Sequence, residues 1–250
     1  LHGLFGSSDN WVTIAKDISN LFTVYLPDLR NHGNSPHSDV HDYHSMSDDI
    51  IKFAEDQKLE KYFLAGHSMG GKVAMAVAIK KPGLIPGMII ADISPFEKET
   101  ETGKAVIEYS EILKTVLNTN LRFAVKREEI ESQLAKGIGS PEVRALIMKN
   151  LRRNSDGSFG WKFNADSLLK NIEKITSGFT SAMAQDEQIT GFPVIFLKGE
   201  NSDYISAEGF KDILKIFPGA ELNIIKNAGH WVQADNPEAV KEAFRELLNN

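Results

Sequence analysis

The pentapeptide Gly66-His67-Ser68-Met69-Gly70 lies between an apolar run, residues 62–65, and a helix-forming run, residues 71–78. A G-x-S-x-G pattern between a strand and a helix is typical of a nucleophile elbow, a turn so tight that the serine backbone is strained. A Cβ at either flanking position would collide with the neighbouring strand or helix, which explains the two glycines. The pattern therefore predicts a serine hydroxyl exposed at the carboxyl edge of a sheet, above a helix N-terminus.

Two backbone amides are expected to form an oxyanion hole beside Ser68. Met69 supplies the first, because its N–H is among the free amides at the start of the helix and can donate to the oxygen of an attacked carbonyl group. The second is expected at the amide of Leu4, in the loop His2-Gly3-Leu4-Phe5-Gly6, since hydrolases built around such an elbow hold this donor in an HG-x loop. A plain turn with a buried histidine is the alternative interpretation of this loop.

A serine nucleophile needs a histidine that takes its proton and a carboxylate that orients this histidine. His230 is the only histidine C-terminal to the elbow, and it follows the last expected strand. Asp92 ends an apolar strand pattern, whereas Asp203 lies one position beyond the usual place of the acid, which Ser202 occupies. A shift of one residue in an extended segment turns a side chain to the opposite face. We therefore favour Asp92 as the acid and keep Asp203 as the alternative.

The composition is that of an ordinary globular protein. The 250 residues are 42% hydrophobic and 25% charged, which suits one domain with an insertion. A net charge of −6 without a lysine or arginine cluster disfavours nucleic acid and acidic membranes as partners. The chain has no cysteine, which suits a reducing compartment, and no apolar run long enough to span a bilayer. We expect a cytoplasmic monomer or small homo-oligomer; since the chain opens inside a motif at Leu1, a preceding targeting segment is compatible with this view.

The order of the patterns predicts an α/β fold with a mostly parallel sheet flanked by helices. Residues 97–187 differ from the rest, because they are charged, helix-patterned and almost free of strand signals. This difference predicts a helical lid at residues 97–187, inserted at the carboxyl edge of a core formed by residues 1–96 and 188–250. Strands are expected at residues 21–26, 62–65, 88–95, 192–199 and 221–225, and lid helices at 101–117, 127–136, 141–151 and 166–175.

Aromatic residues of the loops and the lid are candidates for a substrate pocket. The residues expected to line it are Phe5, Trp161 and Trp231. Three further lid residues either wall an acyl pocket or pack the core of the lid itself: Phe123, Phe159 and Phe163.

No metal or cofactor is expected. His37, His41 and His44 have helical spacing, but their stretch is polar and lacks an apolar shell that would hold ligands in place. We interpret this stretch as the solvated start of a helix. Arg30 and His32, in the loop after residues 21–26, are assigned a structural role.

Taken together, the motifs resemble the α/β-hydrolase superfamily. Within it, the chain is similar to the branch of small esterases and acyl-CoA thioesterases that includes bacterial enzymes and mitochondrial relatives. The resemblance implies that Asp92 is the acid, because members carry an Asn-Ser dipeptide like Asn201-Ser202 where other hydrolases have the acid. The residues that carry it are His2-Gly3-Leu4-Phe5-Gly6, residues 28–35, residues 66–72, Asp92-Ile93-Ser94-Pro95 and Gly229-His230, and Trp161-Lys162-Phe163-Asn164 is similar to a lid motif of the branch.

The expected function is cleavage of a small-molecule ester or thioester, with a short acyl chain or an acyl-CoA as substrate, through an acyl-enzyme on Ser68. The same residues would also serve an acyltransferase that passes the acyl group to an alcohol, a hydrolase of carbon–carbon bonds, or a cofactor-free perhydrolase. A ligand sensor that keeps the triad is an alternative from another class of protein. Multiple turnover separates an enzyme from such a sensor.

Overall fold

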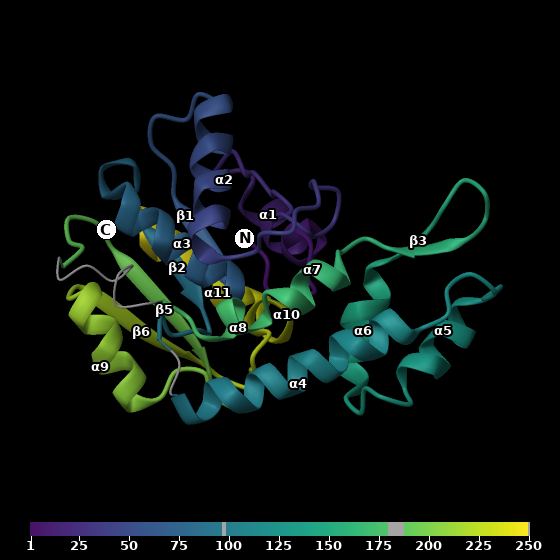
Figure 1. Ribbon diagram of the computed structural model, residues 1–250. Coiled ribbons are helices and arrows are strands. Elements are labelled where there is room, and N and C mark those ends of the chain that lie inside the picture. Colours follow the sequence, from purple (N-terminus) through teal and green to yellow (C-terminus); the bar gives the residue numbers. More distant parts are fainter. Residues whose placement is uncertain (97–98, 180–187, 250) are drawn as a thin grey trace.

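A four-stranded parallel sheet organises the chain in the computed structural model, which describes residues 1–96, 99–179 and 188–249 (Figure 1). Its strands, in spatial order, are β1 (Leu64–His67), β2 (Met88–Ala91), β5 (Val194–Gly199) and β6 (Ala220–Ile225). All neighbours pair in parallel, so their carboxyl ends meet at one edge. The loops that leave this edge lie side by side, which is where open sheets bind ligands. The predicted α/β fold with a parallel sheet is confirmed.

Helices cover both faces of the sheet (Figure 1). Those on one face are α2 (Tyr43–Asp56) and α3 (Met69–Lys80), and those on the other are α1 (Val12–Ile18) and α11 (Pro237–Asn249). Shorter elements complete the core: 3₁₀ turns at Ser8–Trp11 and Pro82–Leu84, α9 (Ala207–Ile216) and α10 (Val232–Asp235). Within the described ranges, no helix has both the length and the apolar character needed to cross a bilayer.

The central strands contribute to two separate cores. Ile90 and Phe196 belong to the core on the side of α2 and α3, whereas Ile89 and Ile195 belong to the core on the side of α1 and α11. Successive side chains of a strand point to opposite faces, so a strand covered by helices on both faces is apolar at every position. This is why β2 and the first four residues of β5, Val194 to Leu197, are visible in the sequence as uninterrupted apolar runs.

The segment between β2 and β5 contains helices and one small hairpin. Its elements are α4 (Glu99–Asn118), α5 (Arg127–Leu134), α6 (Pro141–Lys149), β3 (Leu151–Arg153), β4 (Phe159–Trp161), α7 (Ala165–Lys170) and α8 (Ile172–Thr176). α4 packs against α7 and α8, and α5, α6 and β3 extend to one side of the molecule (Figure 1). The limits expected for the lid, residues 97 and 187, lie outside the described residues, and its assignment as a lid stays a prediction.

Two details of this segment differ from the sequence-based expectation. The β3–β4 hairpin was not predicted, because strands of three residues are too short to show an alternating pattern. The helix expected at residues 166–175 is instead two helices that meet at Asn171. The Asn171 side-chain amide donates to the Asp39 carbonyl oxygen at 2.8 Å, a tertiary contact that fixes the junction and leaves no periodic signal in the sequence.

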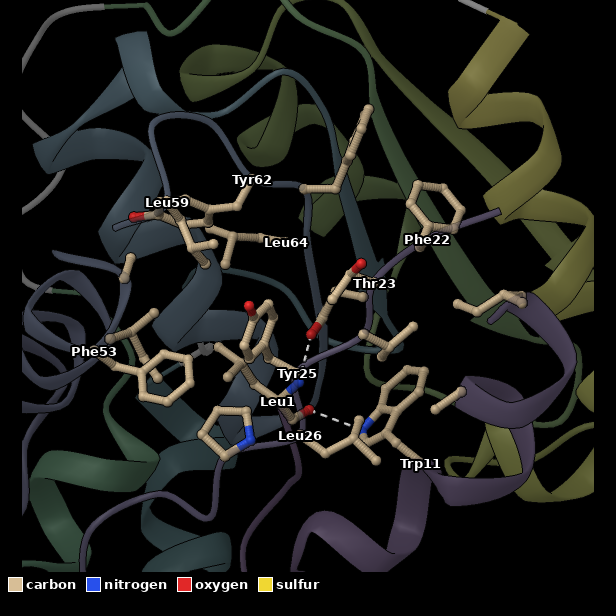
Figure 2. A pocket seen from close by; sticks show the side chains of 18 of the residues that line it. Leu1, Trp11, Phe22, Thr23, Tyr25, Leu26, Phe53, Leu59, Tyr62 and Leu64 are labelled. Atoms are coloured by element: carbon tan, nitrogen blue, oxygen red, sulfur yellow. Dashed lines mark hydrogen bonds between the residues drawn. The ribbon is translucent and has the colours of Figure 1, made fainter. Parts of the chain in front are cut away.

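Residues 21–26 do not form the expected strand. An apolar groove of about 440 Å³ separates this segment from β1, with Phe22 and Leu26 on one wall and Tyr62 and Leu64 on the other (Figure 2). A strand is defined by hydrogen bonds to a neighbouring strand, and the groove occupies the place where that neighbour would lie. The apolar side chains of the segment therefore line the groove instead of joining the sheet.

Leu1 lies at the end of this groove and contacts β1. Its amino group donates to the Ala65 carbonyl oxygen at 2.5 Å, and its carbonyl oxygen accepts from the His67 N–H at 3.1 Å and from the Trp11 indole at 2.9 Å (Figure 2). The two backbone bonds form one rung of a parallel ladder in which Leu1 is opposite Gly66. The loop that follows Leu1 is thereby held beside the strand that leads to Ser68.

Candidate active site

Ser68 stands at the turn between β1 and α3. Its backbone has φ of 52° and ψ of −120°, a conformation that is strained for a residue with a side chain. A Cβ on Gly66 would overlap the backbone of Gly70, and a Cβ on Gly70 would come within 2.5 Å of the His2 carbonyl oxygen. The second collision is with the N-terminal loop and not with the adjacent strand or helix. These contacts produce the tight turn that the G-x-S-x-G pattern predicts.

Asp92 follows β2 directly and is completely buried. One carboxylate oxygen accepts from the Gly199 N–H at 3.0 Å, and the other accepts from the Ser202 hydroxyl and from Nδ1 of His230, the latter at 2.8 Å. A buried carboxylate is tolerated only when such donors replace its lost hydration. The loops after β5 and β6 therefore each contribute a hydrogen-bond donor to this one side chain.

His230 lies in the loop between β6 and α10. Because Nδ1 donates to Asp92, the neutral imidazole keeps Nε2 free to accept a proton. Nε2 of His67 donates to the His230 carbonyl oxygen at 2.8 Å, which ties this loop to the elbow, and burial lowers the pKa of His67 well below its usual range. His230 and Ser68 line the same cavity, of about 150 Å³, at the carboxyl edge of the sheet. A hydroxyl, an imidazole and a carboxylate thus converge there.

The alternative acid, Asp203, is exposed to solvent. Its neighbour Ser202 is buried and hydrogen-bonds Asp92, so the usual acid position of this loop holds a partner of the acid. In this arrangement, His230 contacts Asp92 and not Asp203.

The loop that carries Leu4 is supported by two buried histidines. Nε2 of His2 accepts from the Leu29 N–H at 2.9 Å, and Nε2 of His32 accepts from the Phe5 N–H at 3.3 Å. Both rings must be neutral to accept, and burial lowers the pKa of His2 to about 3 and that of His32 to about 4. The structural role expected for His32 agrees with this contact. Leu4 lines the cavity together with Ser68, and Met69 begins α3 directly after Ser68; their role as oxyanion donors stays a prediction.

The stretch from His37 to His44 differs from the expected solvated start of a helix. His41 is completely buried, and its Nδ1 lies 3.3 Å from the side-chain amide of Asn31. Burial lowers the pKa of His41 to about 3. Nearby, the Arg30 guanidinium forms two hydrogen bonds to Asp49, at 2.6 and 2.7 Å, which agrees with the structural role expected for it. In the part of the chain that the structure describes, no group of acidic and histidine side chains is arranged to hold a metal ion.

The cavity contains two of the three residues expected to line a substrate pocket, Phe5 and Trp231. Trp161 is not among its lining residues, because its ring stacks on Phe163, which itself packs against Phe5. Phe123 is 74% exposed, so it does not pack into the core of the lid.

Other residues at the cavity were missed in the sequence. Tyr109 from α4 and Tyr204 from the loop after β5 both line it. Their roles depend on contacts between distant segments, and a lone tyrosine in a helix or a loop carries no signal that would single it out. Ser202 was noted only as the residue at the usual acid position; an Asn-Ser dipeptide there is the one available hint of its contact with Asp92.

Comparison with known proteins identifies the family of the chain. Residues 1–237 match the family model for the alpha/beta hydrolase fold. An esterase structure from a marine microorganism is 41% identical, with a TM-score of 0.92 over 99% of this chain and 93% of that one. The sn-1-specific diacylglycerol lipase ABHD11 of Danio rerio is 36% identical over 95% of this chain and 73% of that protein. A probable alcohol acetyltransferase of Saccharomyces cerevisiae is 32% identical over 99% of this chain and 75% of that protein.

The chain belongs to the α/β-hydrolase family, as the elbow, the sheet and the loops at its carboxyl edge indicate. Within this family it is similar to proteins named as esterases and lipases, so the resemblance expected from the motifs is confirmed at that level.

Proposed function

We propose that this protein hydrolyses carboxylic esters through an acyl-enzyme on Ser68. The chain is of the ester-hydrolase class by its similarity to esterases and a diacylglycerol lipase. The observation that supports the residue assignment best is the hydrogen bond between Asp92 and His230, beside a cavity that His230 shares with Ser68. A neutral imidazole oriented in this way can serve as a general base.

In the proposed mechanism, Nε2 of His230 takes the proton of the Ser68 hydroxyl while the serine oxygen attacks the ester carbonyl carbon. The oxyanion that forms is held by the amides of Leu4 and Met69, and Asp92 stabilises the imidazolium. The imidazolium then protonates the leaving alcohol, and the acyl group stays on Ser68. His230 then takes a proton from a water molecule that attacks this second ester, and it returns that proton to the Ser68 oxygen as the acid leaves.

The acyl group proposed for the substrate is short. Two small cavities adjoin Ser68, of about 150 and 60 Å³, and apolar residues of the segment between β2 and β5 line the larger one, namely Ile112, Val143 and Leu146. The inserted segment therefore acts in this proposal as the lid that limits the length of the acyl chain. The proposal extends to acyl-CoA thioesters, because Ser68 attacks a thioester carbonyl carbon by the same route.

Acyl transfer to an alcohol is the second candidate. It is favoured by the similarity to a probable alcohol acetyltransferase. Chemically, the two reactions diverge only at the acyl-enzyme, which an alcohol attacks in place of water.

The test is a series of p-nitrophenyl esters from acetate to laurate. We expect steady turnover that is fastest for the short chains, and a loss of about 10⁴-fold or more in kcat for Ser68→Ala. Ser19→Ala, at an exposed serine on the surface, is the matched control and should keep full activity. Butyryl-CoA in place of the p-nitrophenyl ester tests thioester cleavage, and added ethanol with detection of ethyl esters tests transfer. A folded wild-type protein that turns over none of these esters would contradict the proposal.

A further inference from the structure

Tyr204 lies against the face of the His230 imidazole. The centroids of the two rings are 3.8 Å apart, and their planes differ by 19°. Tyr204 belongs to the loop after β5, and its N–H donates to Oγ of Ser202 at 3.3 Å, which in turn donates to Asp92. The same short loop therefore contacts both members of the Asp92–His230 pair, one through a hydroxyl and the other through an aromatic ring.

The hydroxyl of Tyr204 connects this ring to the inserted segment. It lies 3.0 Å from the hydroxyl of Tyr109, which projects from α4. The Tyr109 ring also packs edge-on against Phe5, with centroids 6.1 Å apart, and both tyrosines line the cavity beside Ser68. A continuous set of contacts thus runs from α4 through two phenol groups to His230.

Other contacts hold His230 at Nδ1 and at its backbone, and the tilted ring of Trp231 lies 6.0 Å from its ring. Asp92 holds Nδ1, and His67 holds the backbone carbonyl oxygen. The imidazole can pivot about its Cβ–Cγ bond, and a ring packed flat on its face opposes this motion. The ring of His67 is tilted by 49° at a centroid distance of 4.6 Å, so it does not lie flat on the imidazole. The parallel ring of Tyr204 does.

We propose that Tyr204 is a positioning residue for His230, and that the hydroxyl pair with Tyr109 makes this positioning depend on α4. The inference rests on the proposed function, in which His230 moves the protons. The stacked ring keeps Nε2 aimed at Ser68, and its π face stabilises the imidazolium that forms when Ser68 is deprotonated. Since Tyr204 acts on the base and not on the ester, its removal affects kcat and leaves KM nearly unchanged.

The kinetic test compares Tyr204→Leu, Tyr204→Phe and Tyr109→Phe with p-nitrophenyl acetate as the substrate. We expect Tyr204→Leu to lower kcat about 10-fold with KM changed less than about 2-fold, because both the stacking and the pivot restraint are lost. Tyr204→Phe keeps the ring, so its kcat should be about 3-fold higher than that of Tyr204→Leu. Each Phe variant should lower kcat about 3-fold, and the double variant no further, since both remove the same hydrogen bond.

Tyr25→Leu is the matched control for stability. Tyr25 is 40% exposed and Tyr204 38%, but Tyr25 packs on Phe53 beside the groove of Figure 2, away from Ser68. It should leave kcat unchanged. The inference is overturned if Tyr204→Leu keeps the wild-type kcat, if it raises only KM, or if Tyr204→Phe is as impaired as Tyr204→Leu.

A spectroscopic readout separates this inference from the proposed function. An aromatic face stacked on an imidazole shifts the His230 Cε1 proton upfield in the NMR spectrum, with or without turnover. The shift should persist in Tyr204→Phe and disappear in Tyr204→Leu. If the wild type hydrolyses no ester but shows this pattern, the proposed function fails and the placement of the ring is supported. If esters are hydrolysed but the His230 signal is the same in all three proteins, the inference fails and the function stands.

Discussion

The two sides of the candidate site are built in different ways. The nucleophile side is a run of consecutive residues, from Gly66 to Gly70, whose shape follows from steric contacts within the turn and with the adjacent loop. The acid–base side joins Asp92 to His230, which are 138 positions apart in the chain, and depends on Ser202 from a third loop. A local turn can be recognised from its own residues, whereas a pair of this kind exists only when three strands end at the same edge.

The two sides also differ in the charge of the buried side chains that hold their loops in place. Neutral, buried histidines hold the loop beside the elbow, because His2 and His32 accept hydrogen bonds from backbone amides. On the other side, the fully buried carboxylate of Asp92 accepts hydrogen bonds from residues of two loops. Substitutions and acid should therefore damage the two sides by different routes.

After the loss of Ser68 itself, the largest effect is expected from Asp92→Asn, which removes the carboxylate beside His230. The amide cannot stabilise an imidazolium and favours the wrong tautomer of His230, so kcat/KM for p-nitrophenyl acetate should fall about 10³- to 10⁴-fold. Asp203→Asn is the matched control at the neighbouring acid, which is exposed, and we expect a change of less than about 2-fold. Equal losses in both variants, or a larger loss for Asp203→Asn, would assign the acid differently.

Gly66→Ala tests whether steric contacts determine the turn that carries the nucleophile. The added Cβ overlaps the backbone of Gly70, which cannot move without opening the elbow, so the free energy of unfolding should fall by about 3 kcal/mol or more. Urea denaturation measures this loss. Gly83→Ala is the control, since a Cβ there meets nothing within 4 Å, and its stability should stay within about 0.5 kcal/mol of the wild type. A Gly66→Ala protein as stable as Gly83→Ala would show that the turn is not sterically determined.

The buried histidines should make the stability of the folded protein sensitive to acid. Burial lowers the pKa of His2 and His41 to about 3 and that of His32 to about 4, whereas the unfolded chain titrates near the ordinary value of about 6.5. Below pH 6.5, the unfolded state binds more protons than the folded state, so stability is fully present above that pH and falls toward pH 4. At pH 5, each of these histidines should cost about 2 kcal/mol of unfolding free energy.

Urea denaturation at pH 8 and pH 5 measures this acid sensitivity. His41→Asn should make the difference between the two pH values smaller by about 2 kcal/mol, because one buried imidazole no longer titrates. His44→Asn is the control, since the His44 side chain is 71% exposed. An unchanged difference in His41→Asn would mean that this ring is accessible to protons in the folded protein.

Much of this architecture could be predicted from local patterns. Strands that are buried on both faces are mainly apolar, so β2 and β5 were recognisable, and the elbow was recognisable from its glycines and its position between a strand and a helix. The expectations that failed concern segments whose state depends on a distant partner. Residues 21–26 have the composition of a strand, yet a groove and not a strand lies beside them. His41 lies in a polar stretch, yet it is buried under the loop of Asn31.

By itself, the sequence determined the position of Ser68 in a strained turn, the two parallel-type strands and the order of Ser68, Asp92 and His230 along the chain. Steric collisions at glycine and the burial of alternating side chains act over a few residues, so a short stretch specifies them. Only the tertiary structure decided that Asp92 and not Asp203 contacts His230, and that Tyr204 and Tyr109 lie beside it. These contacts follow from how the sheet brings the ends of its strands together, which no single stretch of the chain encodes.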